Sequence, residues 1–195
     1  MLVLSAVIAY LIGSISFSTL IGRWFGKIDI REHGSGNAGA TNTLRVLGAR
    51  YAIIVLLADI AKGVVAVLLA QALGGGNPWV TYLSALAVIV GHNWPIYFGF
   101  RGGKGVATTI GVLLILMPKS LLTACLVAVI LIAITRYVSL GALVLAVLTP
   151  IAGIVYHGGT GKVVLAVVVG VLTIWRHRKN IHRLLHGQEH RVFSK

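Results

Sequence analysis

The sequence predicts an all-α polytopic membrane protein, and three observations point to this class. Of the 195 residues 57% are hydrophobic, whereas soluble domains lie near about 45–50%. The apolar residues form long runs and do not alternate with polar ones as in half-buried strands. Lys and Arg gather at the ends of these runs, as at the cytoplasmic ends of membrane helices. Because the polar segments are too short to bury a core of their own, a single membrane domain covering residues 1–195 is expected.

Seven apolar stretches mark the expected transmembrane helices. In order, they are Leu2–Ile21, Tyr51–Leu73, Trp79–Phe98, Gly105–Met117, Ser120–Ile134, Leu140–Tyr156 and Val163–Trp175. The first has no basic residues ahead of its apolar part, which argues against a cleaved signal peptide and favours a retained span. The second carries Asp59 and Lys62. The third contains Pro95, which should kink or end its helix.

The fourth and fifth stretches are short. A run of about 13 residues covers ~20 Å, less than the ~30 Å of a hydrocarbon core. Some spans are therefore expected to be short or broken, with the segment before the fourth stretch dipping into the membrane. The sixth and seventh stretches are apolar runs bounded by the polar segments 136–139 and 157–162 and by the basic tail.

Positive charge sets the expected orientation. With the N-terminus outside and the C-terminus in the cytoplasm, 14 of the 17 Lys and Arg residues fall on the cytoplasmic side, where such residues are retained. This topology accounts for much of the formal net charge of +13. Nucleic-acid binding is therefore not expected, whereas anionic lipids and small anionic substrates remain candidate partners.

One polar segment, FRGGKG at residues 100–105, places a lysine among glycines. It is not a nucleotide-binding loop of the G-x-x-x-x-G-K-[ST] type, because Phe98 stands at the first glycine position and Gly105 follows the lysine. Glycines still expose backbone N–H groups, and the following helix favours an anion at its N-terminus. We predict a phosphate site made of Gly102, Gly103, Lys104 and Gly105. The alternative is a basic turn placed by charge bias alone.

A second polar segment, HGSGNAGATNTLR at residues 33–45, leads directly into a helix. Such a run can form a nest of backbone N–H groups for an anion, and the Arg45 guanidinium offers paired hydrogen bonds to phosphate. Hydroxyl and amide side chains can bind phosphate or a substrate hydroxyl. The residues predicted to contribute are Ser35, Gly36, Asn37, Thr41, Asn42 and Arg45. A flexible polar linker is the alternative.

Other polar side chains lie near the predicted membrane boundary. His92 is about one turn inside the third stretch, where an ionisable residue is a functional candidate; it serves equally as a structural donor that orients a loop. His177 and Asn180 begin the basic tail and could face the same cavity as the glycine segments. Asp59 and Lys62, three residues apart, share a helix face, either as a neutralised pair or as a proton or ion relay.

The remaining chemistry is limited by the scarcity of carboxylates. Only Asp29, Glu32 and Glu189 lie in the predicted cytoplasmic segments, so a two-carboxylate hydrolase or a carboxylate-held magnesium site is hard to build. No histidine precedes either aspartate in a His-x-x-x-x-Asp box, and no G-x-S-x-G elbow is present. The tail histidines recur every four residues, but only Glu189 accompanies them, so no metal site is expected. No cofactor is expected either.

The chain resembles the bacterial membrane-bound glycerol-3-phosphate acyltransferases that use acyl phosphate as donor, the PlsY family. The resemblance rests on three blocks in the same order, SGNAGATN at 35–42, GHNWPIYFGFRGGKGVAT at 91–108 and RKNIHRLLHGQE at 178–189. Arg101 stands where the family would carry lysine, and it keeps the charge. The resemblance implies seven spans, an active site on the cytoplasmic side of the bacterial inner membrane and acylation of the sn-1 hydroxyl of glycerol 3-phosphate. The products would be lysophosphatidic acid, for phospholipid biosynthesis, and inorganic phosphate, without CoA or acyl carrier protein.

The residue pattern fits this chemistry. Both substrates carry phosphate, and the chain has two glycine-rich segments. Because an acyl phosphate is already activated, positioning and charge stabilisation suffice, and direct attack without an acyl-enzyme is expected. We assign acyl phosphate to Lys104 and the 102–105 backbone and glycerol 3-phosphate to Ser35, Arg45, His177 and Asn180. The reverse assignment of the two phosphates stays open.

The proton of the attacking hydroxyl is expected to pass to a substrate phosphate oxygen, to His92 or to His177. The predicted catalytic set is thus Ser35, His92, Lys104 and His177, in a monomer surrounded by membrane lipids. The competing class is a transporter for a phosphorylated solute. The short predicted outer loops, poor in anion ligands, argue against it.

Overall fold

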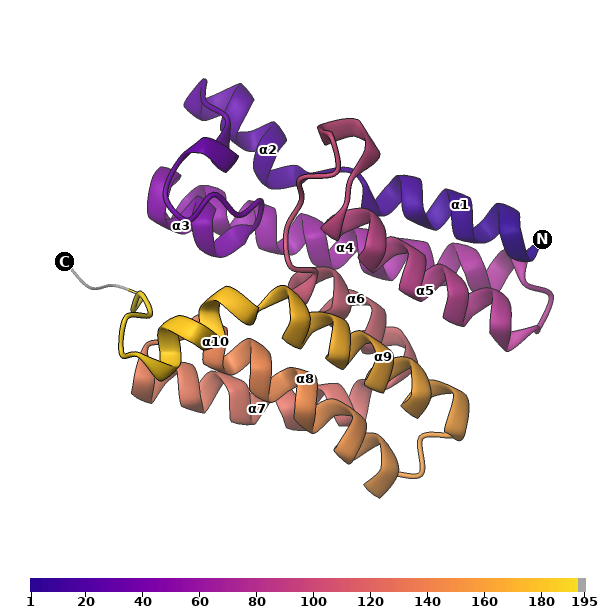
Figure 1. The fold of residues 1–195 in the computed structure, drawn as a ribbon. Helices are drawn as coiled ribbons and strands as arrows, with labels where there is room; N and C mark the ends of the chain where they lie inside the picture. Colours follow the sequence, from indigo (N-terminus) through magenta and orange to yellow (C-terminus); the bar gives the residue numbers. More distant parts are fainter. Residues whose placement is uncertain (193–195) are drawn as a thin grey trace. The chain divides into compact units, whose positions relative to one another are not determined.

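The computed structural model describes residues 1–192, which form helices and loops with no β-strand among them. The all-α prediction is confirmed. The chain separates into two compact units, Met1–Ile115 and Leu116–Lys195, so a single domain remains a prediction. The helices (Figure 1) are α1 (Leu2–Gly13), α2 (Phe17–Ile21), α3 (Ala40–Leu47), α4 (Ala49–Leu73), α5 (Pro78–Asn93), α6 (Val106–Leu116), α7 (Pro118–Thr135), α8 (Val138–Val155), α9 (Thr160–Arg176) and α10 (Arg178–Leu185).

In the first unit α1 packs against both α4 and α5, and α3 lies along α4 (Figure 1). The close approach of α1 and α5 depends on Gly13, since a Cβ there would overlap the carbonyl of Val88. The buried core includes Val55, Val67 and Ile89, each at most 1% exposed. This packing fixes the ends of α4 and α5, from which the polar segments extend.

The first predicted span, Leu2–Ile21, is broken in the structure. α1 ends at Gly13 and α2 begins at Phe17. At the break the Ser16 and Thr19 hydroxyls are hydrogen-bonded to each other at 2.8 Å. The freed carbonyl of Ile15 accepts a hydrogen bond from the Lys62 ammonium of α4 at 2.8 Å. The predicted first span is supported, since Leu2–Gly26 is long and apolar enough to cross a membrane, and its interruption agrees with the expectation that some spans are broken.

α5 is shorter than its predicted stretch, and both of its ends follow from sequence. Asn77 caps it by accepting a hydrogen bond from the Trp79 amide at 3.0 Å, with Pro78 in the first turn, where proline needs no hydrogen-bond partner. The helix ends at Asn93, two residues before Pro95, since the residue before proline is disfavoured in a helix. The expected effect of Pro95 is confirmed, and the rest of the apolar stretch forms the separate turn Ile96–Phe98.

In the second unit α8 packs against α7 and α9. Pro150 lies inside α8 and has no N–H to donate to the carbonyl of Ala146, one turn earlier. Gly170 of α9 approaches that carbonyl so closely that a Cβ would lie 2.6 Å from it. α9 and α10 meet at a bend of 61°, with His177 between them.

Four helical segments in the described chain are long and apolar enough to cross a membrane, or five if the bent pair α9–α10 counts as one span. The four are Leu2–Gly26, Ala49–Leu73, Pro118–Thr135 and Val138–Val155. α6 is apolar but shorter, in line with the short fourth stretch. The prediction of seven spans remains a prediction.

Candidate active site

The first glycine-rich segment is ordered by Asn42, which is 1% exposed. Its side-chain oxygen accepts from the Ser35 amide at 2.8 Å, and its Nδ2 donates to the carbonyls of Ile30 and His33 at 2.9 and 3.0 Å. Both amide hydrogens are therefore used inside the protein. Asn42 holds the loop in shape, and its role in substrate binding remains a prediction.

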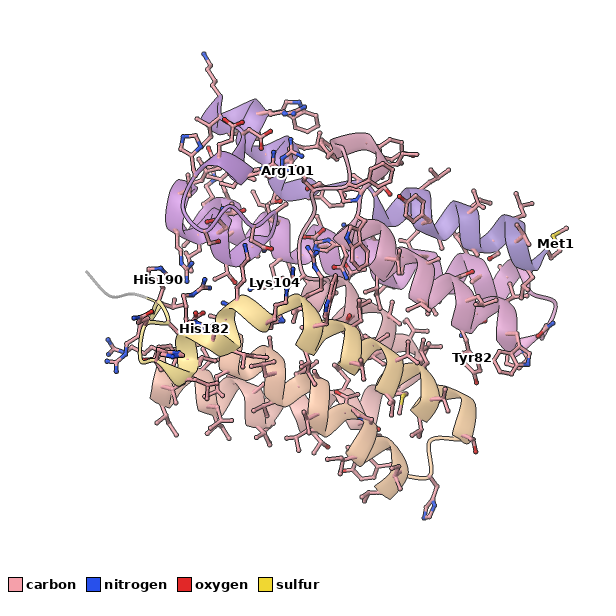
Figure 2. All side chains as sticks on the ribbon, in the orientation of Figure 1. Met1, Tyr82, Arg101, Lys104, His182 and His190 are labelled. Carbon is pink, nitrogen blue, oxygen red and sulfur yellow. The ribbon has the colours of Figure 1, made fainter. Side chains whose placement is uncertain are left out.

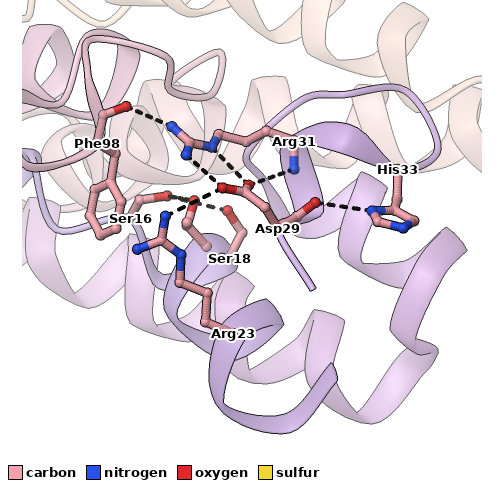
Figure 3. Close-up of polar contacts among 8 residues, drawn as sticks. Ser16, Ser18, Arg23, Asp29, Arg31, His33 and Phe98 are labelled. Atoms are coloured by element: carbon pink, nitrogen blue, oxygen red, sulfur yellow. Dashed lines mark hydrogen bonds and ion pairs between the residues drawn. The ribbon is translucent and has the colours of Figure 1, made fainter. Parts of the chain in front are cut away.

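Arg31, just before this segment, pairs with Asp29 and is hydrogen-bonded to the turn before the lysine segment (Figure 3). Arg31 donates to both carboxylate oxygens of Asp29, at 2.8 and 2.6 Å, and to the carbonyl of Phe98 at 2.6 Å. The Arg31 side chain is 12% exposed, whereas Arg23, which adds a 3.4 Å contact to Asp29, is 53% exposed. Arg31 therefore connects the turn Ile30–Glu32 to the turn Ile96–Phe98. An acidic and a basic residue two apart in a polar segment was the signal available in the sequence.

The same contact controls the charge of Asp29. Hydrogen bonds from Arg31, opposed by partial burial, hold the pKa of the Asp29 carboxyl well below its usual range. Asp29 therefore stays ionised at any pH near neutrality, and its pairing with Arg31 persists.

The lysine segment runs between the turn Ile96–Phe98 and α6. Lys104 is half-buried and Arg101 is exposed (Figure 2). The Gly103 amide donates to the carbonyl of His92 at 3.1 Å, so this N–H is engaged within the protein. A Cβ on Gly102 would overlap the same carbonyl. The glycines thus serve close packing, in addition to any role in anion binding.

The two glycine-rich segments meet at Gly103. A Cβ at this position would overlap both the Nε2 atom of His92 and the carbonyl of Ala38, which belongs to the first segment. Ala38 is 1% exposed. Segments more than sixty residues apart in the sequence are therefore packed directly against each other, as the prediction of a shared site requires.

A buried polar residue beside the lysine segment escaped the sequence analysis. Asn93 is 0% exposed, and neither atom of its amide has a hydrogen-bond partner within the described residues. A Cβ on Gly105 would lie 3.0 Å from the Asn93 oxygen. Because buried amides normally bond a protein group or water, Asn93 is a further polar group available at the start of α6. Its place in the His-Asn-Trp-Pro run was the available signal.

His92 joins the pair that was predicted on α4. The Lys62 ammonium lies 2.7 Å from Asp59 Oδ1 and 3.0 Å from His92 Nδ1. The Asp59 contact is an ion pair. Both side chains of the pair are at most 3% exposed. The neutralised pair is confirmed, and its connection to His92 links it to the lysine segment.

In the second unit His177 is buried at the bend between α9 and α10. Its Nδ1 lies 2.8 Å from the carbonyl of Thr173. Since a carbonyl only accepts, Nδ1 carries a proton. In the neutral imidazole the lone pair is therefore on Nε2.

Asn180 is held by Glu189, which had no predicted role in the site. Glu189 accepts hydrogen bonds from Asn180 Nδ2 at 2.6 Å, Arg183 Nε at 2.7 Å and the Ser139 hydroxyl at 2.9 Å. Burial raises the pKa of this carboxyl, but the hydrogen bonds, led by that of Asn180, outweigh burial and leave the pKa below its ordinary value. Glu189 therefore fixes the orientation of the Asn180 amide.

The tail histidines form a stack. The rings of His182 and His186 (the former labelled in Figure 2) lie with centroids 4.2 Å apart and planes 22° apart. Within residues 1–192 no group of three His, Cys, Asp or Glu side chains is placed to hold a metal ion.

The predicted site residues therefore fall into two groups. The first unit contains Ser35, Gly36, Asn37, Thr41, Asn42, Arg45, His92, Gly102, Gly103, Lys104 and Gly105, and the second contains His177 and Asn180. Ser35 and Arg45 are exposed, whereas His92, His177 and Asn180 are buried. Their roles toward substrate remain predictions.

These features define an integral, multi-pass helical membrane protein whose glycine-rich polar segments pack together at the ends of its helices. The chain belongs to the glycerol-3-phosphate acyltransferase family, whose model matches residues 3–187. A glycerol-3-phosphate acyltransferase of Shouchella clausii is 54% identical over 199 residues, covering 100% of this chain and 97% of that protein. One of Halalkalibacterium halodurans is 51% identical over 192 residues, covering 96% and 93%.

A solved structure is also similar. The crystal structure of PlsY, an integral membrane glycerol 3-phosphate acyltransferase, in its glycerol 3-phosphate form matches with a TM-score of 0.92 at 39% identity. The match covers 97% of this chain and 94% of that chain. The lysophosphatidic acid form of the same protein matches with a TM-score of 0.89.

Proposed function

We propose that this protein transfers a fatty acyl group from acyl phosphate to the sn-1 hydroxyl of glycerol 3-phosphate, forming lysophosphatidic acid and inorganic phosphate. The observation that carries the proposal is the direct packing of the two glycine-rich segments at Ala38 and Gly103. Two phosphorylated substrates need two anion-binding elements within reach of one reacting carbon. The relatives named above support glycerol 3-phosphate as acceptor, and acyl phosphate as donor is the finer part of the proposal.

In this proposal Lys104 and the backbone of Gly102–Gly105 bind the acyl phosphate, and the unpartnered amide of Asn93 adds a polar contact beside Gly105. Ser35 and Arg45, both exposed, bind glycerol 3-phosphate with Gly36, Asn37 and Thr41. His177 and Asn180 contribute from the second unit. Arg31 acts indirectly, because it holds the neighbouring turn in place, and Asn42 orders the loop in addition to its predicted contact with substrate.

The reaction needs no protein nucleophile. The sn-1 oxygen attacks the acyl carbon, a new ester C–O bond forms, and the bond from that carbon to the phosphate oxygen breaks. Positive charge from Lys104 and hydrogen-bond donors stabilise the developing oxyanion and the departing phosphate. The hydroxyl proton passes to a phosphate oxygen of a substrate or to Nε2 of His177, which carries a lone pair in the neutral ring.

The proposal includes the topology expected from the charges. We place the N-terminus outside, the C-terminus and active site on the cytoplasmic side of the bacterial inner membrane, and seven passages across it in one monomeric membrane domain. Two of these passages would be formed by α5 and α6, which are shorter than a standard span. The acyl chain would lie between helices, in contact with lipid.

The test is turnover by purified protein in detergent or lipid mesophase with palmitoyl phosphate and glycerol 3-phosphate. We expect phosphate release that depends on glycerol 3-phosphate, with lysophosphatidic acid as the lipid product. Lys104→Ala should lose at least about 100-fold in kcat/KM, the scale of removing one charge-stabilising donor. The exposed Lys119→Ala should match the parent protein.

Two outcomes would contradict the proposal. Turnover with acyl-CoA but not with palmitoyl phosphate would replace the donor. Binding of glycerol 3-phosphate by a folded protein that turns over neither donor would favour transport of a phosphorylated solute instead.

A further inference from the structure

The buried ion pair of α4 is joined to the lysine segment through His92. We propose that Asp59 and Lys62 fix His92 as the neutral tautomer with its proton on Nε2. In this form His92 is a positioning residue that holds the lysine segment against the first glycine-rich segment, and it is not the acceptor of the substrate proton.

The first step concerns the charge of Lys62. Its Nζ lies 2.7 Å from Asp59 Oδ1, with the two side chains 3% and 2% exposed. An isolated buried charge is very costly, whereas two opposite charges in contact neutralise each other. Lys62 also donates to the carbonyl of Ile15 at 2.8 Å. These two contacts are those of an ammonium group, which has three N–H donors and no lone pair.

The second step follows from the contact between Lys62 and His92, at 3.0 Å from Nζ to Nδ1. Because the ammonium only donates, Nδ1 accepts. A proton on Nδ1 would point an N–H toward the ammonium, and Asp59 Oδ1 lies 3.5 Å away, too far for a strong replacement. The proton of the neutral ring is therefore on Nε2.

The third step concerns what Nε2 faces. It lies against Gly103, on the side that also meets the carbonyl of Ala38. The carbonyl of His92 accepts from the Gly103 amide at 3.1 Å. His92 therefore contacts Gly103 with its ring, and its backbone carbonyl accepts the Gly103 hydrogen bond. Gly103 is the neighbour of Lys104. With hydrogen on Nε2 and Lys62 on Nδ1, neither ring nitrogen has a lone pair ready to take a substrate proton.

A simple helix-packing role for the ion pair is the competing explanation. It would leave the tautomer of His92 unspecified and would make Asp59, Lys62 and His92 matter for stability alone. The position of Nε2 at the junction of the two glycine-rich segments favours the positioning role.

The decisive measurement is nitrogen NMR of the histidine rings in ¹⁵N-labelled full-length protein in detergent at pH 7. His92→Gln identifies the His92 signals by their disappearance. We expect a protonated Nε2 and an unprotonated Nδ1, and loss of this single tautomer in Lys62→Met. A protonated Nδ1, or a doubly protonated ring, would overturn the proposal. Because this measurement needs no turnover, its result is independent of the proposed function.

A second experiment measures turnover of variants and rests on the proposed acyl transfer. His92→Gln keeps an N–H donor near the Nε2 position, so we expect kcat within about tenfold of the parent, whereas loss of a general base costs typically 10²–10⁴-fold. His92→Phe, which lacks the donor, should lose far more. Lys62→Met should reduce kcat at least about tenfold, and Lys119→Met, the same change at an exposed site, should not. Equal and large losses in His92→Gln and His92→Phe would show that His92 takes the proton.

Discussion

His92 and His177 show how one residue type takes two chemical forms. His177 donates from Nδ1 to the carbonyl of Thr173 at 2.8 Å, so the lone pair of its neutral ring is on Nε2. His92 accepts at Nδ1 from Lys62 and has the opposite tautomer. The hydrogen bond at one ring nitrogen thus sets which nitrogen carries the lone pair of a neutral histidine.

A substitution at Asn180 tests its hydrogen bond with the carboxylate of Glu189. Asn180→Asp would place a second carboxylate beside Glu189, at the 2.6 Å contact now made by the amide. We expect at least about a 100-fold loss of activity from misorientation or repulsion of this group. Adding Glu189→Gln should restore part of the activity, because its amide can donate to the new carboxylate. Activity of the double variant no higher than that of Asn180→Asp would contradict this pairing.

Gly103 tests the junction of the two glycine-rich segments. In Gly103→Ala the new methyl group would overlap His92 and the backbone of Ala38, and the backbone cannot move aside without displacing the loop. We expect a protein that loses most of its turnover. The matched control is Gly39→Ala, whose methyl group would meet only the Asn37 amide at 3.2 Å and should cost much less. Similar kcat/KM values for the two variants would be inconsistent with the packing.

Among the elements, the connection between the turns Ile30–Glu32 and Ile96–Phe98 depends on Arg31. Arg31→Met removes hydrogen bonds to Asp29 and to the carbonyl of Phe98, and we expect a loss of about 2–3 kcal/mol in the free energy of unfolding. Arg23→Met, at a side chain 53% exposed, should cost less than about 1 kcal/mol. Denaturation of both variants in detergent measures the difference. Equal losses would refute the connection.

The stability that Glu189 contributes to the tail beyond α10 should depend on pH. The folded-state pKa of Glu189 is lowered from its ordinary value of 4.5. The carboxylate therefore stabilises the tail fully above that pH, and the contribution disappears as the pH falls through the lower folded-state pKa. We expect the stability difference between the parent and Glu189→Gln to be constant from pH 6 to pH 8 and to shrink in acid. A difference that grows as the pH falls would contradict the pairing.

At the scale of the whole molecule the topology can be read by labelling cysteines. Cys125 is the one cysteine in the sequence, so Cys125→Ser provides a background for single introduced thiols. An impermeant maleimide should label Thr160→Cys in intact cells and Gln188→Cys only after permeabilisation; both positions are exposed. The reverse pattern would invert the proposed orientation.

The sequence predicted the helical class, the polar segments, the effect of Pro95 and the Asp59–Lys62 pair, because these depend on composition and on local spacing. It did not predict contacts between distant residues. Arg31 and Phe98 are 67 residues apart, Ser139 and Glu189 are 50 apart, and Lys62 and His92 are 30 apart. Periodicity shows which face of a helix is apolar, but the partner of that face depends on tertiary packing. Broken spans were expected, but the position of the break between α1 and α2 was not predicted, since Lys62 from another helix satisfies its carbonyl.

That break also constrains how the chain is made. The Ile15 carbonyl is synthesised long before Lys62, which is 47 residues later, and His92 follows after 30 more. At roughly 5–20 residues per second, the ribosome takes several seconds to supply all three. During that interval the first hydrophobic segment carries an unpaired carbonyl, and the second enters the insertion machinery with an incomplete polar cluster. We therefore expect the N-terminal unit to become stable in the bilayer only once these helices are present together. Nascent chains arrested before residue 92 should be more easily extracted from the membrane than those arrested beyond it.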